Sequence, residues 1–394
     1  DGGSRGIMAG GFPGSTSGQD VIDYFNIESA GNAIDFGNLT DARWGIATGA
    51  SGTRGLFAGG DSPGDVNTID FITFSSTGNA QDFGDVGPDQ WRYGMGLSNQ
   101  TRFVIAGGAT TPAGQSDMIQ SLTIASQGNT VDSGGNLVGG DRQAGSCCCS
   151  PTRGIIAGGY TPGALNIIEF INMGSLGDSQ DFGDTSSNTH TELGTCSSTT
   201  RGIIKIAIDG TPATQVDKIE LATLGNSVDF GDLTNKANGG AGFSSKTRGF
   251  VAGGNTPDGY GINVIQFVTI ATAGNATDFG DVGYSRANPR GISNNTRGVY
   301  SGGESASSPN PALNNIEFVT MSTSGNGQDF GDLVDAGQSF ATASSPTRGL
   351  NMGGYRDGEV NFIDFITIAT TGNSQDFGDL LNTARNGNGG VSNG

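Results

Sequence analysis

The stretch TRGIIAGG, from Thr152 to Gly159, decides the fold together with NIIEFINM, from Asn166 to Met173, and GDSQDFGD, from Gly177 to Asp184. The first piece is a short apolar run closed by two glycines. The second alternates apolar and polar residues and is rich in β-branched and aromatic side chains. Each piece is bounded by Gly, Asn, Asp or Ser, which is typical of short strands joined by tight turns. No helical period accompanies them, so this stretch predicts antiparallel β-structure.

The same unit recurs eight times and fills the chain of 394 residues. A Thr-Arg or Ser-Arg dipeptide opens each copy, and the copies begin near residues 4, 53, 101, 152, 200, 247, 296 and 347. A small-residue segment such as LGTCSST, from Leu193 to Thr199, leads into the next copy and supplies a fourth strand. Eight repeats of four strands predict a single all-β domain over residues 1–394, an eight-bladed β-propeller.

Two of the connections in each repeat vary in length, whereas the other two are constant. The first variable connection changes by two residues at a time, which keeps every side chain on its own face of the sheet. Connections in a blade alternate between the two ends of the disc, so both variable connections are expected on one face. Variable loops on a rigid scaffold are where binding sites usually lie. The aromatic residues expected on this face are Phe12, Trp44, Trp91, Tyr93, Tyr160, Tyr260, Tyr284 and Tyr355.

Composition limits the classes of function. The chain has 71 glycines and a net charge of −19 from 38 acidic and 19 basic residues. Nucleic-acid binding through phosphates needs clustered Lys and Arg, so it is not expected. No apolar run is long enough for a membrane span, and Asp1 is followed by nothing that resembles a signal peptide.

Three residue types repeat with the unit and are interpreted as structural. The Phe is expected to form a wedge between blades, with Ser133 in its place in the third copy. The Asp before it is expected to accept hydrogen bonds from turn amides or to pair with the repeated Arg. Calcium binding by these acids is a weaker alternative. The repeat residues chosen for this role are Arg54, Arg153, Arg297, Arg348, Asp82, Asp181, Asp329, Asp376, Phe83, Phe182, Phe330 and Phe377.

The repeat pattern resembles the kelch repeat, with a Gly pair, an alternating strand and an aromatic residue followed by Arg, as at Ala42-Arg43. The sequence segments TRG, AGG and DFGD also resemble Gly-rich propeller repeats of marine bacteriophage structural proteins. The kelch resemblance implies that the small-residue strand is innermost. It also implies that the chain ends with the first strand of the blade in which it begins. Val391 should therefore pair beside Ile7 and close the ring.

Residues suited to catalysis are scarce. His190 is the only histidine, so neither a copper site like that of galactose oxidase nor a Ser-His-Asp arrangement is supported. Cys147, Cys148, Cys149 and Cys196 fit no disulfide or zinc spacing and are interpreted as small buried side chains. No cofactor and no metal are expected.

These observations favour a non-enzymatic structural or attachment protein, on a virion or otherwise extracellular. Its expected partners are other virion or surface proteins, or host-surface glycans, with no membrane insertion. A secreted lectin-like propeller is the alternative, and a carboxylate-dependent glycan-active enzyme is a third possibility.

Overall fold

The computed structural model describes the chain apart from residues 1–4, 13–17, 27–32, 63, 88–89, 112–113, 144, 151, 162, 190–194, 198–200, 206–213, 221–222, 236–238, 257–260, 306–310, 339, 355–360, 380–388 and 393–394. The described residues form 37 strands and no helix. All pairings between these strands are antiparallel, as the turn-bounded alternating segments require. The prediction of an all-β fold is confirmed.

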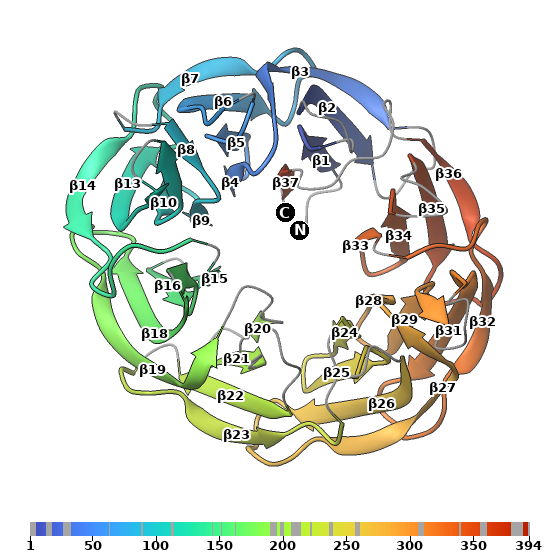
Figure 1. Cartoon of the computed structure of the whole chain (residues 1–394). Helices are drawn as coiled ribbons and strands as arrows, with labels where there is room; N and C mark the ends of the chain where they lie inside the picture. The colour runs from blue at the N-terminus through green and yellow to red at the C-terminus, as the bar shows by residue number, and fades with distance from the viewer. Residues whose placement is uncertain are drawn as a thin grey trace.

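Eight sheets with four principal strands each follow one another along the chain, and Figure 1 shows them arranged around a ring. They are called the first to the eighth sheet below, and each is given from its inner to its outer strand. The first is β37 (Gly389–Ser392), β1 (Arg5–Ala9), β2 (Gln19–Asn26), β3 (Ile34–Arg43); the second is β4 (Ala47–Ala50), β5 (Arg54–Ala58), β6 (Thr68–Thr73), β7 (Gln81–Asp85). The third is β9 (Met95–Ser98), β10 (Arg102–Ala106), β13 (Met118–Thr123), β14 (Val131–Asn136); the fourth is β15 (Ser146–Cys149), β16 (Arg153–Ala157), β18 (Gly163–Asn172), β19 (Gln180–Thr189).

The other four sheets follow the same order. The fifth is β20 (Thr195–Ser197), β21 (Arg201–Lys205), β22 (Gln215–Glu220), β23 (Val228–Asp232); the sixth is β24 (Ala241–Ser244), β25 (Arg248–Ala252), β26 (Ile262–Thr269), β27 (Thr277–Ala287). The seventh is β28 (Arg290–Ser293), β29 (Arg297–Ser301), β31 (Asn315–Thr320), β32 (Gln328–Asp332); the eighth is β33 (Ala341–Ser344), β34 (Arg348–Met352), β35 (Phe362–Thr367), β36 (Gln375–Asp379). Short strands in the variable connections are β8 (Gln90–Arg92), β11 (Ala109–Thr111), β12 (Gly114–Gln115), β17 (Tyr160–Thr161) and β30 (Glu304–Ser305).

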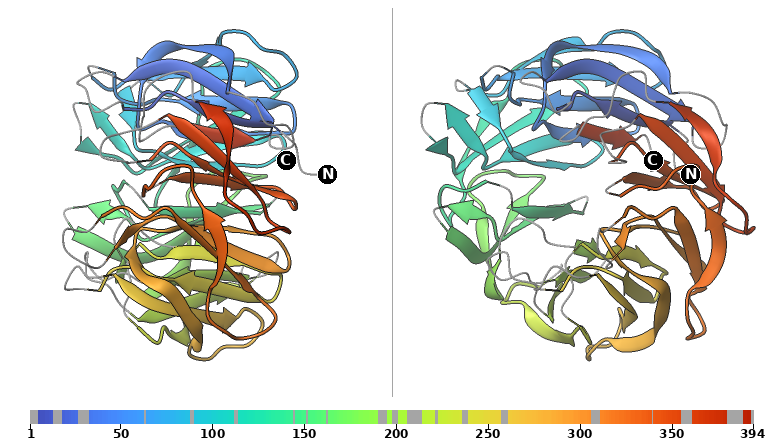
Figure 2. Two further views of the ribbon diagram at one scale, coloured as in Figure 1. Left: turned by 90° about the vertical axis from the view of Figure 1, so that its right-hand side faces the viewer. Right: turned by 45° about the vertical axis from the view of Figure 1, so that its right-hand side comes forward.

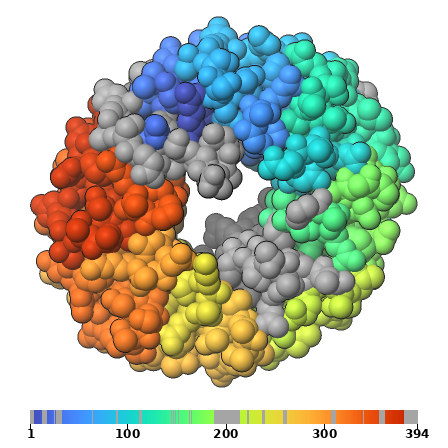
Figure 3. Space-filling view, turned by 180° about the vertical axis from the view of Figure 1, so that it is seen from behind, coloured from blue at the N-terminus to red at the C-terminus, as the bar shows by residue number. Residues whose placement is uncertain are grey.

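The two ends of the chain meet in the first sheet. The C-terminal strand β37 pairs with β1, with Ile7 opposite Val391, so the predicted pairing of these two residues is confirmed. On the outer strands, the backbone N–H of Ala33 donates to the carbonyl of Asp379 at 3.0 Å, which links the first sheet to the eighth. The two further views in Figure 2 show the sheets stacked side by side around the axis, and Figure 3 shows the opening at the centre of the ring.

The hydrophobic core is divided among the boundaries between sheets. The described residues form eight buried clusters, and each cluster draws residues from two neighbouring sheets. The cluster that joins the eighth sheet to the first contains Met8 and Ala33 together with Leu350 and Phe377. The seven repeated Phe residues are all buried in these clusters, which is the position expected of a wedge between blades. They are Phe36, Phe83, Phe182, Phe230, Phe279, Phe330 and Phe377.

On the face with constant turns, described outer strands are joined to the turn of the next sheet, which is Gly-Asn in all but one of these cases. The N–H of Gly128 donates to the carbonyl of Phe83 at 2.7 Å, and the N–H of Asp85 donates to Oδ1 of Asn129 at 3.1 Å. The same pair of bonds recurs from the fourth sheet to the fifth, the fifth to the sixth, the sixth to the seventh and the seventh to the eighth. The third sheet differs because Gly134 is an extra residue. Asn136, and not Gly135, therefore takes the place of the repeated Asp.

The repeated arginine also joins neighbouring sheets, but through a carbonyl group. Arg54 donates to the carbonyl of Ile124 at 2.8 Å, and Arg297 donates to the carbonyl of Ile368 at 3.0 Å. Six of these guanidinium groups lie over an aromatic ring of their own sheet, as Arg153 does over Phe170 at 4.8 Å. The predicted pairing of this Arg with the repeated Asp is wrong for Arg54 and Arg297, because the carbonyl groups that end the neighbouring strand take that place.

The acids of the DFGD element lie at the outer surface. The first Asp of each element is exposed on the outer strand, in all eight repeats. These aspartates are Asp35, Asp82, Asp132, Asp181, Asp229, Asp278, Asp329 and Asp376. Two of them accept a hydrogen bond from the amide two residues further on, as Oδ1 of Asp278 does from Gly280 at 3.0 Å. This is the turn-amide role that the sequence suggested.

The inner strands are built from small residues because neighbouring inner strands approach closely. A Cβ atom on Gly96 would lie 2.5 Å from the carbonyl oxygen of Thr48, and one on Gly291 would lie 2.3 Å from the carbonyl oxygen of Gly242. Cys147 and Cys149 belong to such a strand, and their thiols contact the carbonyls of the preceding inner strand. Cys149 is exposed, so the expectation that the cysteines are buried is wrong for this residue.

Candidate binding face

Where the structure describes them, the two variable connections of a repeat lie on one face, as the alternation of the strands predicts. Val66 pairs with Trp91, which joins both variable connections of the second repeat. Trp44 pairs with Asp61, and Gln143 pairs with Tyr160, so each of these pairs joins neighbouring repeats. We call this side the variable face and the opposite side, which carries the Gly-Asn turns, the constant face.

The variable face places different side chains on the same backbone frame. The residue that pairs across to the next repeat is Trp44 in the first sheet, Arg92 in the second and Gln143 in the third. Its partner is Asp61, Ala109 or Tyr160, respectively. Between the sixth and seventh sheets, Ala287 pairs with Glu304. A constant frame that carries unlike side chains is the arrangement by which a scaffold acquires binding specificity.

Three of the predicted aromatic residues come together at one sector of this face, and we call them the aromatic row. The ring centroids of Phe12 and Trp44 are 5.4 Å apart with the planes tilted by 50°, and those of Trp44 and Tyr93 are 5.7 Å apart with an edge-on arrangement. All three side chains are half-buried. The aromatic row therefore presents ring surface to solvent while each ring supports its neighbour.

The backbone holds the aromatic row in place. Trp44 and Asp61 exchange two backbone hydrogen bonds, at 3.1 and 2.8 Å, and the N–H of Tyr93 donates to the carbonyl of Gly45 at 3.1 Å. Tyr93 adopts a φ of 54°, which is rare for a residue with a large side chain. A Cβ atom on Gly45 would lie 3.1 Å from the Tyr93 ring, so this glycine lets the ring pack directly on the backbone.

Arg92 and two carboxylates border the aromatic row. The Arg92 guanidinium lies over the Tyr93 ring at 5.5 Å, contacts Asp61 at 2.8 Å through Nη1 and contacts Asp65 at 3.2 Å through Nε. Asp65 is almost fully buried, whereas the Arg92 side chain is 37% exposed. Burial raises the pKa of the Tyr93 hydroxyl, Arg92 opposes this shift, and the two aspartates add to it, so the hydroxyl stays protonated at neutral pH.

The remaining predicted aromatics are not part of this row. Trp91 is 2% exposed and belongs to the core between the second and third sheets, so its prediction as a surface residue is wrong. Tyr160 is half-buried beside Gln143, and Tyr284 is 56% exposed on the outer strand β27. Tyr260 and Tyr355 lie outside the described residues, as does His190.

Sequence reasoning missed a buried polar position in the second strand of every repeat. It holds an acid or a glutamine that is at most 5% exposed in each of the eight repeats. The residues are Asp23, Asp70, Gln120, Glu169, Asp217, Gln266, Glu317 and Asp364. Each directly follows a buried isoleucine or valine, and this eightfold regularity is the signal that could have identified them.

Most of the described partners of this position come from the preceding sheet, although Gln120 also accepts a hydrogen bond from Thr130 and Asp217 from Ser227 within their own repeats. Asp70 accepts hydrogen bonds from the backbone N–H of Thr40 at 2.9 Å and from its hydroxyl at 2.8 Å. Asp217 and Gln266 accept the equivalent pairs from Ser186 and Thr234. At these three boundaries the position therefore ties a sheet to the one before it, because a buried polar group requires such partners.

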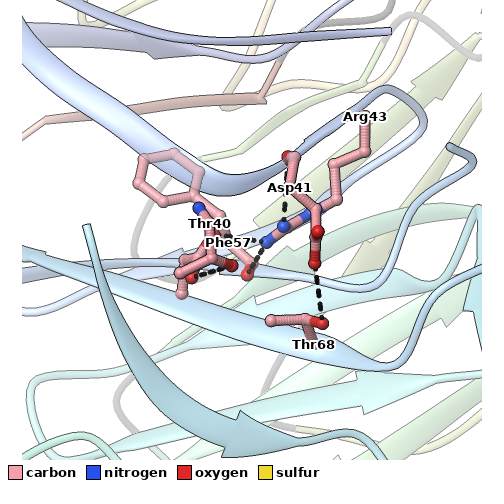
Figure 4. A network of polar contacts seen from close by, with 6 residues as sticks. Thr40, Asp41, Arg43, Phe57 and Thr68 are labelled. Carbon is pink, nitrogen blue, oxygen red and sulfur yellow. Dashed lines mark hydrogen bonds and ion pairs between the residues drawn. The ribbon is translucent and has the colours of Figure 1, made fainter. Parts of the chain in front are cut away.

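Three of these acids also hold a fully buried arginine. Arg43 pairs with Asp70 at 2.9 Å and donates to the carbonyl of Phe57 at 3.2 Å, in the network shown in Figure 4. Arg142 pairs with Glu169, and Arg286 pairs with Glu317 at 3.1 Å. Burial lowers the pKa of all three guanidinium groups, and the paired carboxylate in each case opposes that shift and keeps the arginine charged.

At four of the five sheet boundaries where the structure describes the facing residue, the type of residue at this position matches it; at the fifth, Gly337 takes the place of the arginine and the eighth sheet nevertheless supplies Asp364. In each of these repeats the second glycine of the Gly pair that ends the first apolar strand donates its N–H to a backbone carbonyl. That carbonyl belongs to Arg43, Arg142 and Arg286 in three repeats, and to Trp91 in the second repeat. After each arginine the next sheet supplies an acid, whereas after Trp91 it supplies the neutral Gln120. At those four boundaries the match avoids a buried carboxylate without a counter-charge.

The described part of the chain holds neither a candidate metal group nor a membrane-spanning helix. No three His, Cys, Asp or Glu side chains gather there in a group that could hold a metal ion. No helix there is long and apolar enough to cross a membrane.

Comparison with known proteins gives no family. No protein-family model matches the chain, and no curated protein matches it. Among solved structures, the structure of YjhT is similar at 12% sequence identity over 71% of this chain and 96% of that chain, with a TM-score of 0.47. We argue nothing about this chain from so distant a likeness.

Proposed function

We propose that the chain is a closed, kelch-like eight-bladed β-propeller that works as a non-enzymatic attachment component. Closure is supported by the pairing of β37 with β1 and by the buried cluster shared between the eighth sheet and the first. A ring in which every blade is packed on two others has no free blade at which to unravel. Such rigidity suits a part that carries a binding surface.

The binding surface that we propose is the variable face, and the aromatic row is the observation that carries this proposal. Phe12, Trp44 and Tyr93 come from three separate connections and yet form one contiguous surface. Half-buried Trp and Tyr side chains beside an arginine have the composition of a binding hot spot. On the constant face, by contrast, the Gly-Asn turns are occupied in joining the blades.

The proposed partners are other virion or surface proteins, or host-surface glycans. The proposed location on a virion rests on the sequence of the repeats, which resembles that of phage structural proteins. A secreted lectin-like propeller with equal sites in every blade is less favoured, because the bridging positions of the variable face differ from blade to blade. A carboxylate-dependent enzyme is also less favoured, since both Asp61 and Asp65 are engaged by Arg92.

The experiment compares the two faces of one folded protein. A double variant, Trp44→Ala with Tyr93→Ala, removes the aromatic row, and Thr77→Lys changes an exposed turn residue of the constant face. Binding of each to a glycan panel and to the proteins that cross-link to the chain in its native particle is measured by surface plasmon resonance. We expect the double variant to lose binding and Thr77→Lys to keep it. Loss of binding in Thr77→Lys alone would overturn the proposal.

A further inference from the structure

We infer that the aromatic row is a single subsite for an uncharged sugar, an inference that rests on the proposed function of the variable face. The row consists of the partly exposed rings of Phe12, Trp44 and Tyr93. The face of a sugar ring that carries its C–H groups packs on such aromatic surface, while its hydroxyl groups reach the polar atoms at the border.

The polar border supplies both kinds of hydrogen-bonding partner in fixed positions. Arg92 is partly exposed, so its guanidinium offers N–H donors, and the carboxylate of Asp61 offers acceptor oxygens. Their ion pair at 2.8 Å, together with the contact of Arg92 to the buried Asp65, restricts both side chains. A sugar hydroxyl both donates and accepts hydrogen bonds, so it can be satisfied by such a neighbouring donor and acceptor.

The charge of the site decides between uncharged and acidic sugars. One arginine stands against two aspartates, so the border carries a net charge of −1, and the whole chain carries −19. A sialylated or sulfated glycan would be repelled by this field, and Arg92 already has its carboxylate partners. The expected ligand is therefore an oligosaccharide without carboxylate or sulfate groups.

The site is also preorganised and small. The paired backbones of Trp44 and Asp61 and the position of Tyr93 over Gly45 fix the rings before any ligand arrives, which lowers the entropic cost of binding. A stable protein interface covers about 800 Å² on each partner, far more than three half-buried rings. The bridging positions between other blades hold the small residues Ala109 and Ala287. We therefore expect one such subsite in the described part of the molecule.

The test is isothermal titration calorimetry, which needs no tryptophan reporter in the variants; in the parent chain the fluorescence of Trp44 gives a second signal, since the other tryptophan, Trp91, is buried. The ligands are uncharged hexose and N-acetylhexosamine oligosaccharides and their sialylated or sulfated counterparts. We expect at least one uncharged oligosaccharide to bind with a stoichiometry of one. Its affinity should fall at least tenfold in Trp44→Ala and remain unchanged in Tyr284→Ala, which removes an exposed aromatic outside the row. Thermal melts confirm that both variants are folded.

Each other outcome overturns the inference in a recognisable way. Tighter binding of the acidic glycans would show that the charge argument is wrong, and equal binding by Trp44→Ala would place the sugar elsewhere. If no sugar binds but a partner protein binds and is lost in Trp44→Ala with Tyr93→Ala, the sugar inference fails while the proposed function survives. If the double variant changes no binding at all, both fail.

Discussion

Among single residues, the glycine that follows each repeated Phe is held by the sheet next to it. Gly331 has a φ of 145°, and a Cβ atom there would lie 2.4 Å from the carbonyl group of Gly372 in the next sheet. A side chain would therefore meet both an unfavourable backbone conformation and a backbone that cannot move away. We expect Gly331→Ala to lower the free energy of unfolding by about 3 kcal/mol or more.

The matched control is Gly242→Ala on the inner strand β24. A Cβ atom at Gly242 meets nothing within 4 Å, and no left-handed φ is recorded there. This variant should unfold within about 0.5 kcal/mol of the parent chain. Chemical denaturation of both variants tests the difference, and equal stabilities would refute the role assigned to Gly331.

The buried pair of Arg43 and Asp70 supports a second prediction. Asp70→Asn leaves the Arg43 guanidinium buried without its counter-charge, and we expect it to cost about 3–5 kcal/mol. Arg43→Met leaves the carboxylate with Thr40 as its remaining partner. The double variant should cost clearly less than the sum of the two single variants, because both charges are then gone. Calorimetric melting of the four proteins measures this coupling, and additive losses would contradict it.

Asp70 also shows why sequence reasoning missed the buried acids. It stands between Ile69 and Phe71, so alternation places it on the face opposite to theirs, which is solvent in an ordinary two-layer sheet. Here each sheet is covered on both faces by its neighbours, and all three residues are buried. For Trp91, too, an exposed position was predicted and the side chain is buried. It lies in a polar variable connection but fills the place that Arg43 and Arg142 occupy in their repeats.

Among the elements, the Gly-Asn turn and the outer strand facing it are matched in charge. Asn129, Asn226, Asn275, Asn326 and Asn373 each accept a hydrogen bond from the N–H of an aspartate. In the fourth repeat the turn carries Asp178, and the residue facing it is Asn136. In the second repeat, Asn79 faces Asn38. The seven described pairs therefore never place one carboxylate against another.

The same substitution at two of these turns separates charge from hydrogen bonding. Asn373→Asp would face Asp332 and should lower the free energy of unfolding by about 0.5–1 kcal/mol. Asn79→Asp would face Asn38, as Asp178 faces Asn136, and should be nearly neutral. Thermal melts at low and high salt check both, since the difference should shrink as salt screens the charges. A loss at Asn79 equal to that at Asn373 would contradict the explanation.

For the whole molecule, the sequence predicts the repeat and its four strands because every copy carries them, whereas the innermost strand and the position of the last strand followed from the kelch resemblance. The aromatic row is different. Phe12, Trp44 and Tyr93 were each identified as candidates, but their contact depends on how connections of unequal length lie against each other. No periodic pattern encodes that arrangement, so only three of the eight candidates come together, and the polar border of Arg92, Asp61 and Asp65 was not anticipated.

The last prediction concerns closure of the ring. Ile7 and Val391 are directly opposed in an antiparallel pair, which brings their Cα atoms within the range that a disulfide can span. We expect Ile7→Cys with Val391→Cys to cross-link, in a background where the four native cysteines are replaced by serine. The control pair, Thr68→Cys with Asp85→Cys, is opposed in the same way but closes only a short hairpin.

The two cross-links should differ in what they add to stability. A disulfide that closes a short loop raises the free energy of unfolding by about 3 kcal/mol, and one that closes a loop of about 100 residues raises it by about 4.7 kcal/mol. The longer loop gives more because its closure removes more conformational freedom from the unfolded chain. The Ile7–Val391 cross-link encloses nearly the whole chain. The melting temperature of the protein that carries it should therefore rise more on oxidation than that of the hairpin control. Each protein is compared with its own reduced form, which cancels the cost of the substitutions. If the terminal pair fails to form while the hairpin pair forms, the first sheet is not completed by the C-terminal strand and the ring is open.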